Sequence, residues 1–172
     1  QQAAPLLLDG LCRLEYRGYD SAGVAVCGAG GLQVRKTPGR LKALEELTHG
    51  GADLTGTVGV GHTRWATHGE PSENNAHPHC SEDMNVVGVH NGIIESYQEI
   101  KEKLTRKGHH FYSQTDTEAL INYVDYYYKK YHMGPTDALA KTMVRIRGSY
   151  ALAVMFKDYP GEIFVARKDS PM

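Results

Sequence analysis

A chain of 172 residues with 41% hydrophobic and 23% charged residues has the size and composition of one globular domain with a buried core. The formal net charge of -1 lacks the basic excess typical of nucleic-acid-binding proteins, and no apolar run is long enough to cross a bilayer. We therefore expect neither a nucleic-acid nor a membrane partner. Three cysteines without C-x-x-C spacing argue against a disulfide framework and fit the reducing cytoplasm.

The first half of the chain predicts helices and strands in alternation. Pro5 suits the first turn of a helix that continues through Leu7, Leu11 and Leu14 and ends at Gly18. Strands are expected at residues 22–26, 32–35, 57–62 and 84–90, with a short helix at 41–47. Residues 67–83 form a long polar loop, and long ordered loops are often functional.

The second half predicts three helices and a hairpin. Ser96 with Glu99 and Thr115 with Glu118 have the spacing of capping boxes, each opening a helix. The remaining expected elements are a strand at 111–113, a helix at 136–147 and hairpin strands at 150–157 and 163–167. This mixed order indicates sheets covered by helices in layers.

A run of polar and aromatic residues follows the strand that ends near residue 62. Residues 61–69 read GHTRWATHG. The planar fork of Arg64 suits a substrate carboxylate, because it can bind both oxygens. The alternative is a structural salt bridge beside a half-buried Trp65, and the residue types alone leave both interpretations open.

Asn91 and Gly92 carry a second candidate function. An Asn amide beside the unobstructed N–H of a glycine can form an oxyanion hole, in which one donor contributes roughly 3–4 kcal/mol. The alternative is a tight turn, which the Asn-Gly dipeptide alone favours.

Asp116 lies in the first turn of a predicted helix, where a carboxylate complements the helix dipole. It is also a candidate counter-charge for an ammonium group. Together, Arg64 and Asp116 would match the two charged ends of a free amino acid.

The histidines and cysteines are candidate metal ligands or nucleophiles. The spacing of His62, His68, His77, His79 and His90 fits no helical metal motif, so we expect no metal. Cys12 and Cys27 are expected to be small hydrophobic residues. A Cys80–His79 nucleophile pair is disfavoured, because adjacent side chains rarely point together.

Five segments resemble the glutaminase domain of the glucosamine-6-phosphate synthase family, the glutamine:fructose-6-phosphate amidotransferases. They are residues 13–23, 62–72, 75–79, 90–94 and 115–118. The resemblance spans almost the whole chain, with the motifs in family order. Class II amidotransferases of the phosphoribosyl pyrophosphate and asparagine synthetase types share the chemistry but have looser versions of these motifs.

The resemblance implies an α+β fold, the αββα four-layer sandwich of N-terminal-nucleophile hydrolases, which hydrolyses glutamine to glutamate and ammonia. It places the glutamine carboxylate on Arg64 and the ammonium near Asp116, in a pocket lined by Thr67 and His68. Trp65 would keep the released ammonia from water. No cofactor is implied.

The same resemblance assigns the reacting groups. Asn91 and the N–H of Gly92 would stabilise the oxyanion, while Arg17 and the carbonyl of Gly18 would position the N-terminal amine. The supporting residues behind them are expected to be His62, His77 and His90.

The implied partners lie outside this chain. Ammonia would pass to a separate sugar isomerase domain that converts fructose 6-phosphate to glucosamine 6-phosphate. We expect the full-length protein to be a cytoplasmic homodimer whose subunits contact each other mainly through that isomerase domain.

One departure from the family concerns the nucleophile. In this family it is a cysteine that begins the mature chain, whose own α-amine acts as the base. Residue 1 here is Gln, and Cys12, Cys27 and Cys80 are all internal. The sequence therefore predicts that residues 1–172 are an incomplete glutaminase domain, without the first strand and the C-terminal strands and inactive as given. Two alternatives stay open: an amidotransferase of the phosphoribosyl pyrophosphate type, and a catalytically dead glutamine-binding module.

Overall fold

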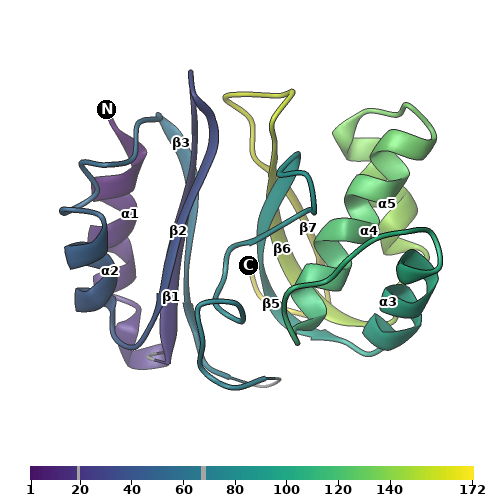
Figure 1. Ribbon diagram of the computed structural model, residues 1–172, viewed down its shortest axis with the longest axis horizontal. Helices are drawn as coiled ribbons and strands as arrows, with labels where there is room; N and C mark the ends of the chain where they lie inside the picture. Colours follow the sequence, from purple (N-terminus) through teal and green to yellow (C-terminus); the bar gives the residue numbers. More distant parts are fainter. Residues whose placement is uncertain (19, 67–68) are drawn as a thin grey trace.

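A computed structural model describes residues 1–18, 20–66 and 69–172 of the chain. Two antiparallel sheets lie face to face, and helices cover the outer face of each (Figure 1). The four layers are the αββα sandwich that was expected, and this prediction is confirmed. Among the described residues, no helix is both long and apolar enough to cross a membrane.

The first sheet has the strand order β2-β1-β3. Its strands are β1 (Ser21–Gly28), β2 (Gly31–Pro38) and β3 (Val58–Arg64), and β1 and β2 form the predicted hairpin. The central strand β1 is apolar on both faces because both are covered. Val24 and Val26 pack toward the helices, while Ala25 and Cys27 pack toward the second sheet.

Two helices cover the first sheet, α1 (Ala3–Cys12) and α2 (Leu41–Leu47). Leu8, Leu11 and Leu44 of these helices are buried in the outer core. The prediction that Leu14 continues the apolar stripe is wrong. The α-helix ends at Cys12, a 3-10 helix (Glu15–Arg17) follows, and Leu14 is 45% exposed.

The second sheet has the order β4-β5-β6-β7. Its strands are β4 (His79–Cys80), β5 (Val86–Ile94), β6 (Gly148–Phe156) and β7 (Phe164–Lys168). Strand β5 continues beyond residue 90, where Asn91 pairs with Ala151 and Gly92 with Tyr150. The turn interpretation of Asn91-Gly92 is therefore wrong, because a neighbouring strand extends the ladder through this dipeptide.

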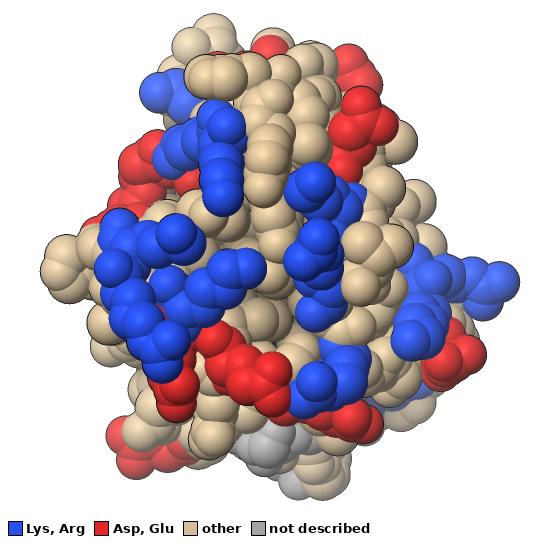
Figure 2. Space-filling model, turned by 90° about the vertical axis from the view of Figure 1, so that its right-hand side faces the viewer, with Lys and Arg blue, Asp and Glu red and all other residues tan. Residues whose placement is uncertain are grey.

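Three helices cover the second sheet, α3 (Tyr97–Thr105), α4 (Asp116–Lys130) and α5 (Pro135–Met143). Their apolar side chains form one core with the sheet, including Ile100, Leu120, Ile121, Val124, Leu152 and Phe156. Figure 2 shows Lys and Arg gathered on this side of the molecule. Several of these lysines lie over tyrosine rings, as Lys141 does at 4.3 Å from the centre of the Tyr131 ring.

The two predicted capping boxes differ in the structure. The Thr115 hydroxyl accepts from the N–H of Glu118 at 3.3 Å, as expected. The Ser96 hydroxyl instead accepts from the N–H of Arg147, which joins the start of α3 to the loop before β6.

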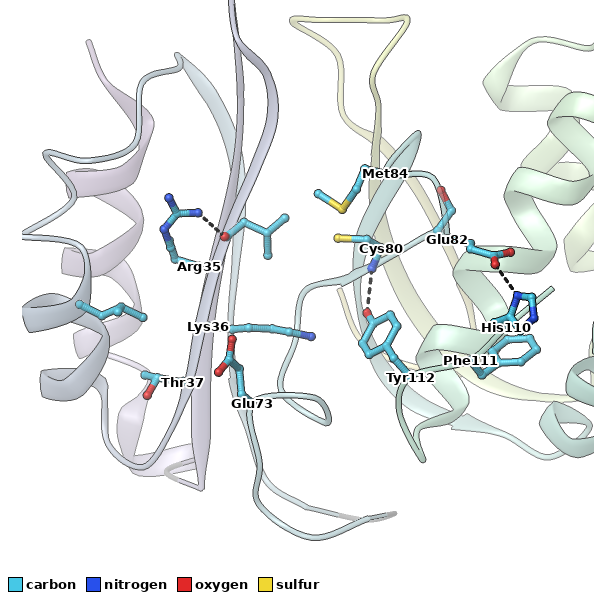
Figure 3. Close-up of a pocket in the computed structure, with 13 residues that line it drawn as sticks. Arg35, Lys36, Thr37, Glu73, Cys80, Glu82, Met84, His110, Phe111 and Tyr112 are labelled. Carbon is cyan, nitrogen blue, oxygen red and sulfur yellow. Dashed lines mark hydrogen bonds and ion pairs between the residues drawn. The ribbon is translucent and has the colours of Figure 1, made fainter.

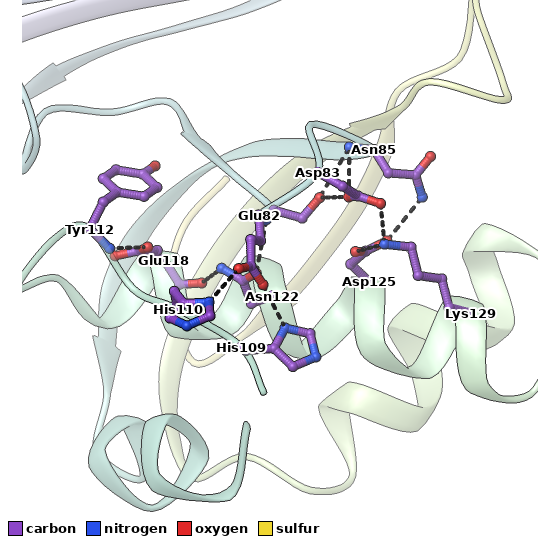
Figure 4. A network of polar contacts seen from close by, with 11 residues as sticks. Glu82, Asp83, Asn85, His109, His110, Tyr112, Glu118, Asn122, Asp125 and Lys129 are labelled. Carbon is purple, nitrogen blue, oxygen red and sulfur yellow. Dashed lines mark hydrogen bonds and ion pairs between the residues drawn. The ribbon is translucent and has the colours of Figure 1, made fainter. Parts of the chain in front are cut away.

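A polar network ties the start of β5 to α4 (Figure 4). Asn85 donates to Asp125 at 2.9 Å, and Lys129 bridges Asp125 and Asp83. Glu82 accepts from His110 at 2.8 Å. These contacts fix the end of the long loop before the chain enters the central sheet.

Residues 111–113 do not form the expected strand. The N–H groups of Tyr112 and Ser113 donate to the Glu118 carboxylate at 2.8 and 2.7 Å, so that carboxylate replaces a strand partner. The Glu118 side chain is completely buried. One carboxylate therefore holds the segment that leads into α4.

We predict that Glu118→Ala lowers the free energy of unfolding by about 3 kcal/mol, because it orphans two backbone N–H groups, each costing about 1–3 kcal/mol. Urea denaturation measures this loss. Glu102→Ala is the control, since Glu102 forms only an exposed pair with Arg106 and should cost less than about 1 kcal/mol. Equal losses in the two variants would contradict the assignment.

Candidate active site

His62 of β3 and Asn91 of β5 join the two facing sheets. Nε2 of His62 lies 2.7 Å from Oδ1 of Asn91. A ring N–H therefore donates to the amide oxygen, and the amide NH2 of Asn91 faces away from the histidine. Asn91 and Gly92 are exposed, so these donors are accessible to a small molecule.

Gly92 has a backbone conformation that only glycine fits here. Its φ is +125°, and a Cβ atom would lie 2.2 Å from the carbonyl oxygen of Ser149 on β6. The glycine thus allows β5 and β6 to pair closely at the position where the exposed amide stands.

A cluster of buried histidines lies behind this pair. The rings of His62 and His77 stack with centroids 4.3 Å apart, and His79 contacts His77 edge-on at 4.9 Å. The Thr117 hydroxyl lies 2.9 Å from Nδ1 of His90 and 3.4 Å from Nε2 of His77. The three predicted supporting residues, His62, His77 and His90, are thereby brought together.

These histidines are neutral near pH 7. Burial lowers the pKa of His62 to about 4, and the positive charge of Arg64 opposes its protonation further, although the Asn91 hydrogen bond raises it. Burial also lowers the pKa of His77 and of His79 well below the usual value, and that of His90 to a lesser degree. Such residues are suited to orienting neighbours by hydrogen bonds.

Arg64 is 4% exposed and organises the loop that follows it. Its Nη2 donates to the carbonyl of Gly69 at 3.1 Å, and its Nη1 donates to that of Glu70 and lies 3.6 Å from the Asp20 carboxylate. Gly18 packs tightly beneath it, since a Cβ there would be 2.9 Å from the Arg64 carbonyl carbon.

Asp116 is buried at the start of α4, and its Oδ2 accepts from the N–H of Ile94 at 2.8 Å. Within the described part of the chain, Oδ1 has no hydrogen-bond partner. Asp116 therefore ties the end of β5 to α4 and retains one carboxylate oxygen for another cation.

The other predicted site residues are Arg17, Trp65, Thr67 and His68. Arg17 ends the 3-10 helix with an exposed side chain, and Trp65 is 60% exposed. Thr67 and His68 lie outside the described residues.

Asn75 and Thr117 were not singled out from the sequence. Asn75 donates to the Glu70 carbonyl at 3.0 Å and accepts from the N–H of Gln114 at 2.9 Å, which clamps the loop after Arg64 to the segment before α4. Both residues lie within the motifs that carry the family resemblance, which was the available signal.

A cavity of about 750 Å³ lies elsewhere between the sheets, and its lining contains none of the predicted site residues (Figure 3). Lys36 extends into it, but its ammonium already donates to the carbonyls of Ala76 and Pro78 at 2.9 and 3.3 Å. Burial raises the pKa of the Cys80 thiol there to about 11. The Cys80 thiol is therefore not activated as a nucleophile, and the Lys36 ammonium is already hydrogen-bonded to the backbone.

The disfavoured Cys80–His79 pair is not formed. Both ring nitrogens of His79 have other partners, the Tyr112 hydroxyl at 3.0 Å and the Thr115 hydroxyl at 2.9 Å. In the described ranges, no three His, Cys, Asp or Glu side chains are grouped as metal ligands.

A family model for the glutamine amidotransferase domain matches residues 24–170. The chain belongs to this family. Over all 172 residues it is 51% identical to the glutamine--fructose-6-phosphate aminotransferase (isomerizing) of Caldanaerobacter subterraneus subsp. tengcongensis. It is 48% identical to the protein of the same name from Clostridium tetani, and it spans 28% of the length of each of these relatives.

Solved structures support the fold assignment. The glutamine phosphoribosylpyrophosphate (PRPP) amidotransferase from B. subtilis matches 98% of this chain with a TM-score of 0.80 and 24% identity, over 35% of its own chain. At this identity the likeness shows the fold alone, and it agrees with the predicted αββα sandwich.

We predict that Gly92→Ala lowers the free energy of unfolding by about 3 kcal/mol or more, because strain at positive φ adds to the clash with Ser149. Gly108→Ala is the matched control: its φ is +91°, and nothing lies within 4 Å of its added Cβ, so we expect a loss of about 1 kcal/mol. Urea denaturation compares them, and losses of the same size would refute a role for the Ser149 contact.

The lowered pKa of His62 predicts an acid-dependent loss of stability. The unfolded chain, with a pKa near 6.5, binds this proton before the folded protein, whose value is about 4. The contribution of neutral His62 to the free energy of unfolding is therefore complete above pH 6.5. Roughly 3 kcal/mol of that free energy is lost as the pH falls to 4. Urea denaturation across this range should show a shallower pH slope for His62→Gln. A slope identical to that of the unsubstituted protein would contradict the prediction.

Proposed function

We propose that this chain is the glutaminase part of a glutamine:fructose-6-phosphate amidotransferase. The observation that carries the proposal is the exposed Asn91-Gly92 dipeptide, held in β5 beside His62, in a chain 51% identical to a protein of that name. The reaction it would serve is hydrolysis of the glutamine side-chain amide to glutamate and ammonia.

The proposed chemistry is acyl transfer. A thiolate attacks the amide carbon, the carbonyl π electrons move to oxygen, and the Asn91 amide and Gly92 N–H donate to that oxyanion. As the oxyanion collapses, the C–N bond breaks and the leaving NH2 group takes up the proton that the thiol lost, which gives ammonia and a thioester. Water then hydrolyses the thioester to glutamate and regenerates the thiol. Donors fixed in advance are effective because they need no reorganisation as the charge develops.

Glutamine would be held by its charged end. Oδ1 of Asp116 is the anchor proposed for the ammonium, and Arg64 the partner proposed for the carboxylate. Arg64 also donates to the carbonyls of Gly69 and Glu70, so a glutamine bound there would share this arginine with the backbone of the following loop. Thr67 and His68 are proposed to line this loop side of the pocket, with Trp65 retaining the ammonia.

The proposal requires an attacking thiol from outside these 172 residues. Burial raises the pKa of Cys27 and of Cys80, which disfavours the thiolate in both. Cys12 is exposed on α1 in the outer layer. In the intact enzyme, Arg17 and the Gly18 carbonyl would position the amine that serves as the base.

The acceptor and assembly are also part of the proposal. Sequence identity favours fructose 6-phosphate, converted by a separate isomerase domain to glucosamine 6-phosphate, over a phosphoribosyl pyrophosphate acceptor. We further propose a cytoplasmic homodimer, formed mainly through that second domain.

The test uses the full-length protein expressed from its complete gene, with glutamate and glucosamine 6-phosphate measured as products. We expect both to form from glutamine and fructose 6-phosphate. Asn91→Ala should lower kcat for glutamate release by about 10²–10³-fold with little change in KM, because the donor acts on the transition state. Gln98→Ala, which removes an exposed amide on α3, should have no effect.

Three outcomes would overturn parts of the proposal. No glutamate release by the full-length protein would refute the glutaminase activity. Glutamine binding in calorimetry without that release would instead support the catalytically dead module. Formation of phosphoribosylamine from phosphoribosyl pyrophosphate, and not of glucosamine 6-phosphate, would reassign the acceptor.

A further inference from the structure

The geometry points to His62 as the positioning residue that determines which end of the Asn91 amide faces the substrate. This inference rests on the proposed function and deepens it. It concerns an arrangement that neither His62 nor Asn91 shows by itself, since they lie on different strands in different sheets, 29 residues apart.

An Asn side chain has a donor and an acceptor of nearly the same shape. Turned one way, Asn91 presents its NH2 group to a developing oxyanion and stabilises it. Turned by 180°, it would present its own oxygen and repel the same charge. Catalysis by Asn91 therefore depends on a partner that prefers one orientation.

His62 supplies that preference by donating from Nε2 to Oδ1 at 2.7 Å. Neutral histidine carries one ring proton, and the other nitrogen, Nδ1, is buried without a hydrogen-bond partner among the described residues. A proton on Nδ1 would be an orphaned buried donor, which is rarer in folded proteins than an orphaned acceptor. The Nε2–H tautomer avoids that cost and leaves Asn91 one favourable orientation.

The His62 ring is held by a stacked neighbour as well as by its hydrogen bond to Asn91. Its ring stacks on that of His77 with an angle of 19° between the planes. His77 in turn approaches Thr117, which also contacts His90, the residue before Asn91. On β1, Gly23 lies opposite His62, and a Cβ atom on Gly23 would come within 2.0 Å of the His77 carbonyl oxygen. The backbone of β1 therefore packs closely against the backbone of His77, whose ring stacks on that of His62.

His62 could also act only as a structural link between the two sheets. Different replacements of His62 distinguish that structural role from the positioning of Asn91. Glutamine places an amide N–H near the position of Nε2 of histidine, whereas asparagine reaches only as far as Nδ1. Phenylalanine keeps the flat ring without a donor. A positioning role therefore predicts that glutamine restores activity and that the other two do not.

The experiment measures glutamine hydrolysis by the full-length protein and its variants. We expect His62→Phe and His62→Asn to lower kcat by about 10²-fold with KM changed less than about 3-fold, and His62→Gln to stay within about 10-fold of the unsubstituted enzyme. Adding Asn91→Ala to His62→Phe should cost nothing more than Asn91→Ala alone, because both remove the same donor. Full kcat in His62→Phe, or multiplicative losses in the double variant, would overturn the inference.

Neutron crystallography of the full-length protein gives a readout that needs neither activity nor a folded variant. We expect deuterium on Nε2 of His62, and we expect the deuterated amide group of Asn91 to face away from that ring. Deuterium on Nδ1, with the Asn91 ND2 group facing the ring, would overturn the inference whatever the kinetics show. An unsubstituted protein with the expected protonation but without glutamine hydrolysis would refute the proposed function alone.

Discussion

The hydrogen bond between His62 and Asn91 crosses the space between the two sheets, and the site depends on it. Two antiparallel sheets facing each other usually meet through apolar side chains, as Ala25, Val87 and Met155 do elsewhere in this sandwich. At one end that contact becomes polar. The strands β3 and β5 then hold a ring donor and an amide acceptor 2.7 Å apart, and the Asn91 side chain is exposed.

Maintaining that polar end is costly. His62, His77 and His90 each have one buried ring nitrogen without a hydrogen-bond partner among the described residues. Burial keeps all three rings neutral, so their pKa values lie below the ordinary range. Groups of this kind reduce stability and persist where orientation is needed, which is consistent with a site that positions donors in advance.

Backbone constraints complete the arrangement. Gly92 permits close pairing with Ser149 at positive φ, while Asp116 binds the N–H of Ile94 and thereby ties the end of β5 to α4. Asn75 connects the loop after Arg64 to the residues before the same helix. The donors and charged groups proposed to hold glutamine are thus supported by a few rigid contacts.

The local sequence pattern was enough to predict the hairpin of β1 and β2, the helix α2 and the cap at Thr115. Such features are determined by the propensities of neighbouring residues and by side chains that contact the backbone a few residues away. The motifs also identified the family, and they contain His62, His77, His90 and Asn91, which lie together in the structure. Tertiary structure decided the rest: β6 extends β5 through Asn91-Gly92, and the Glu118 carboxylate takes the backbone donors of residues 111–113. It also paired His62 with Asn91. These outcomes depend on partners distant in sequence, whose approach is determined by the packing of the whole sandwich.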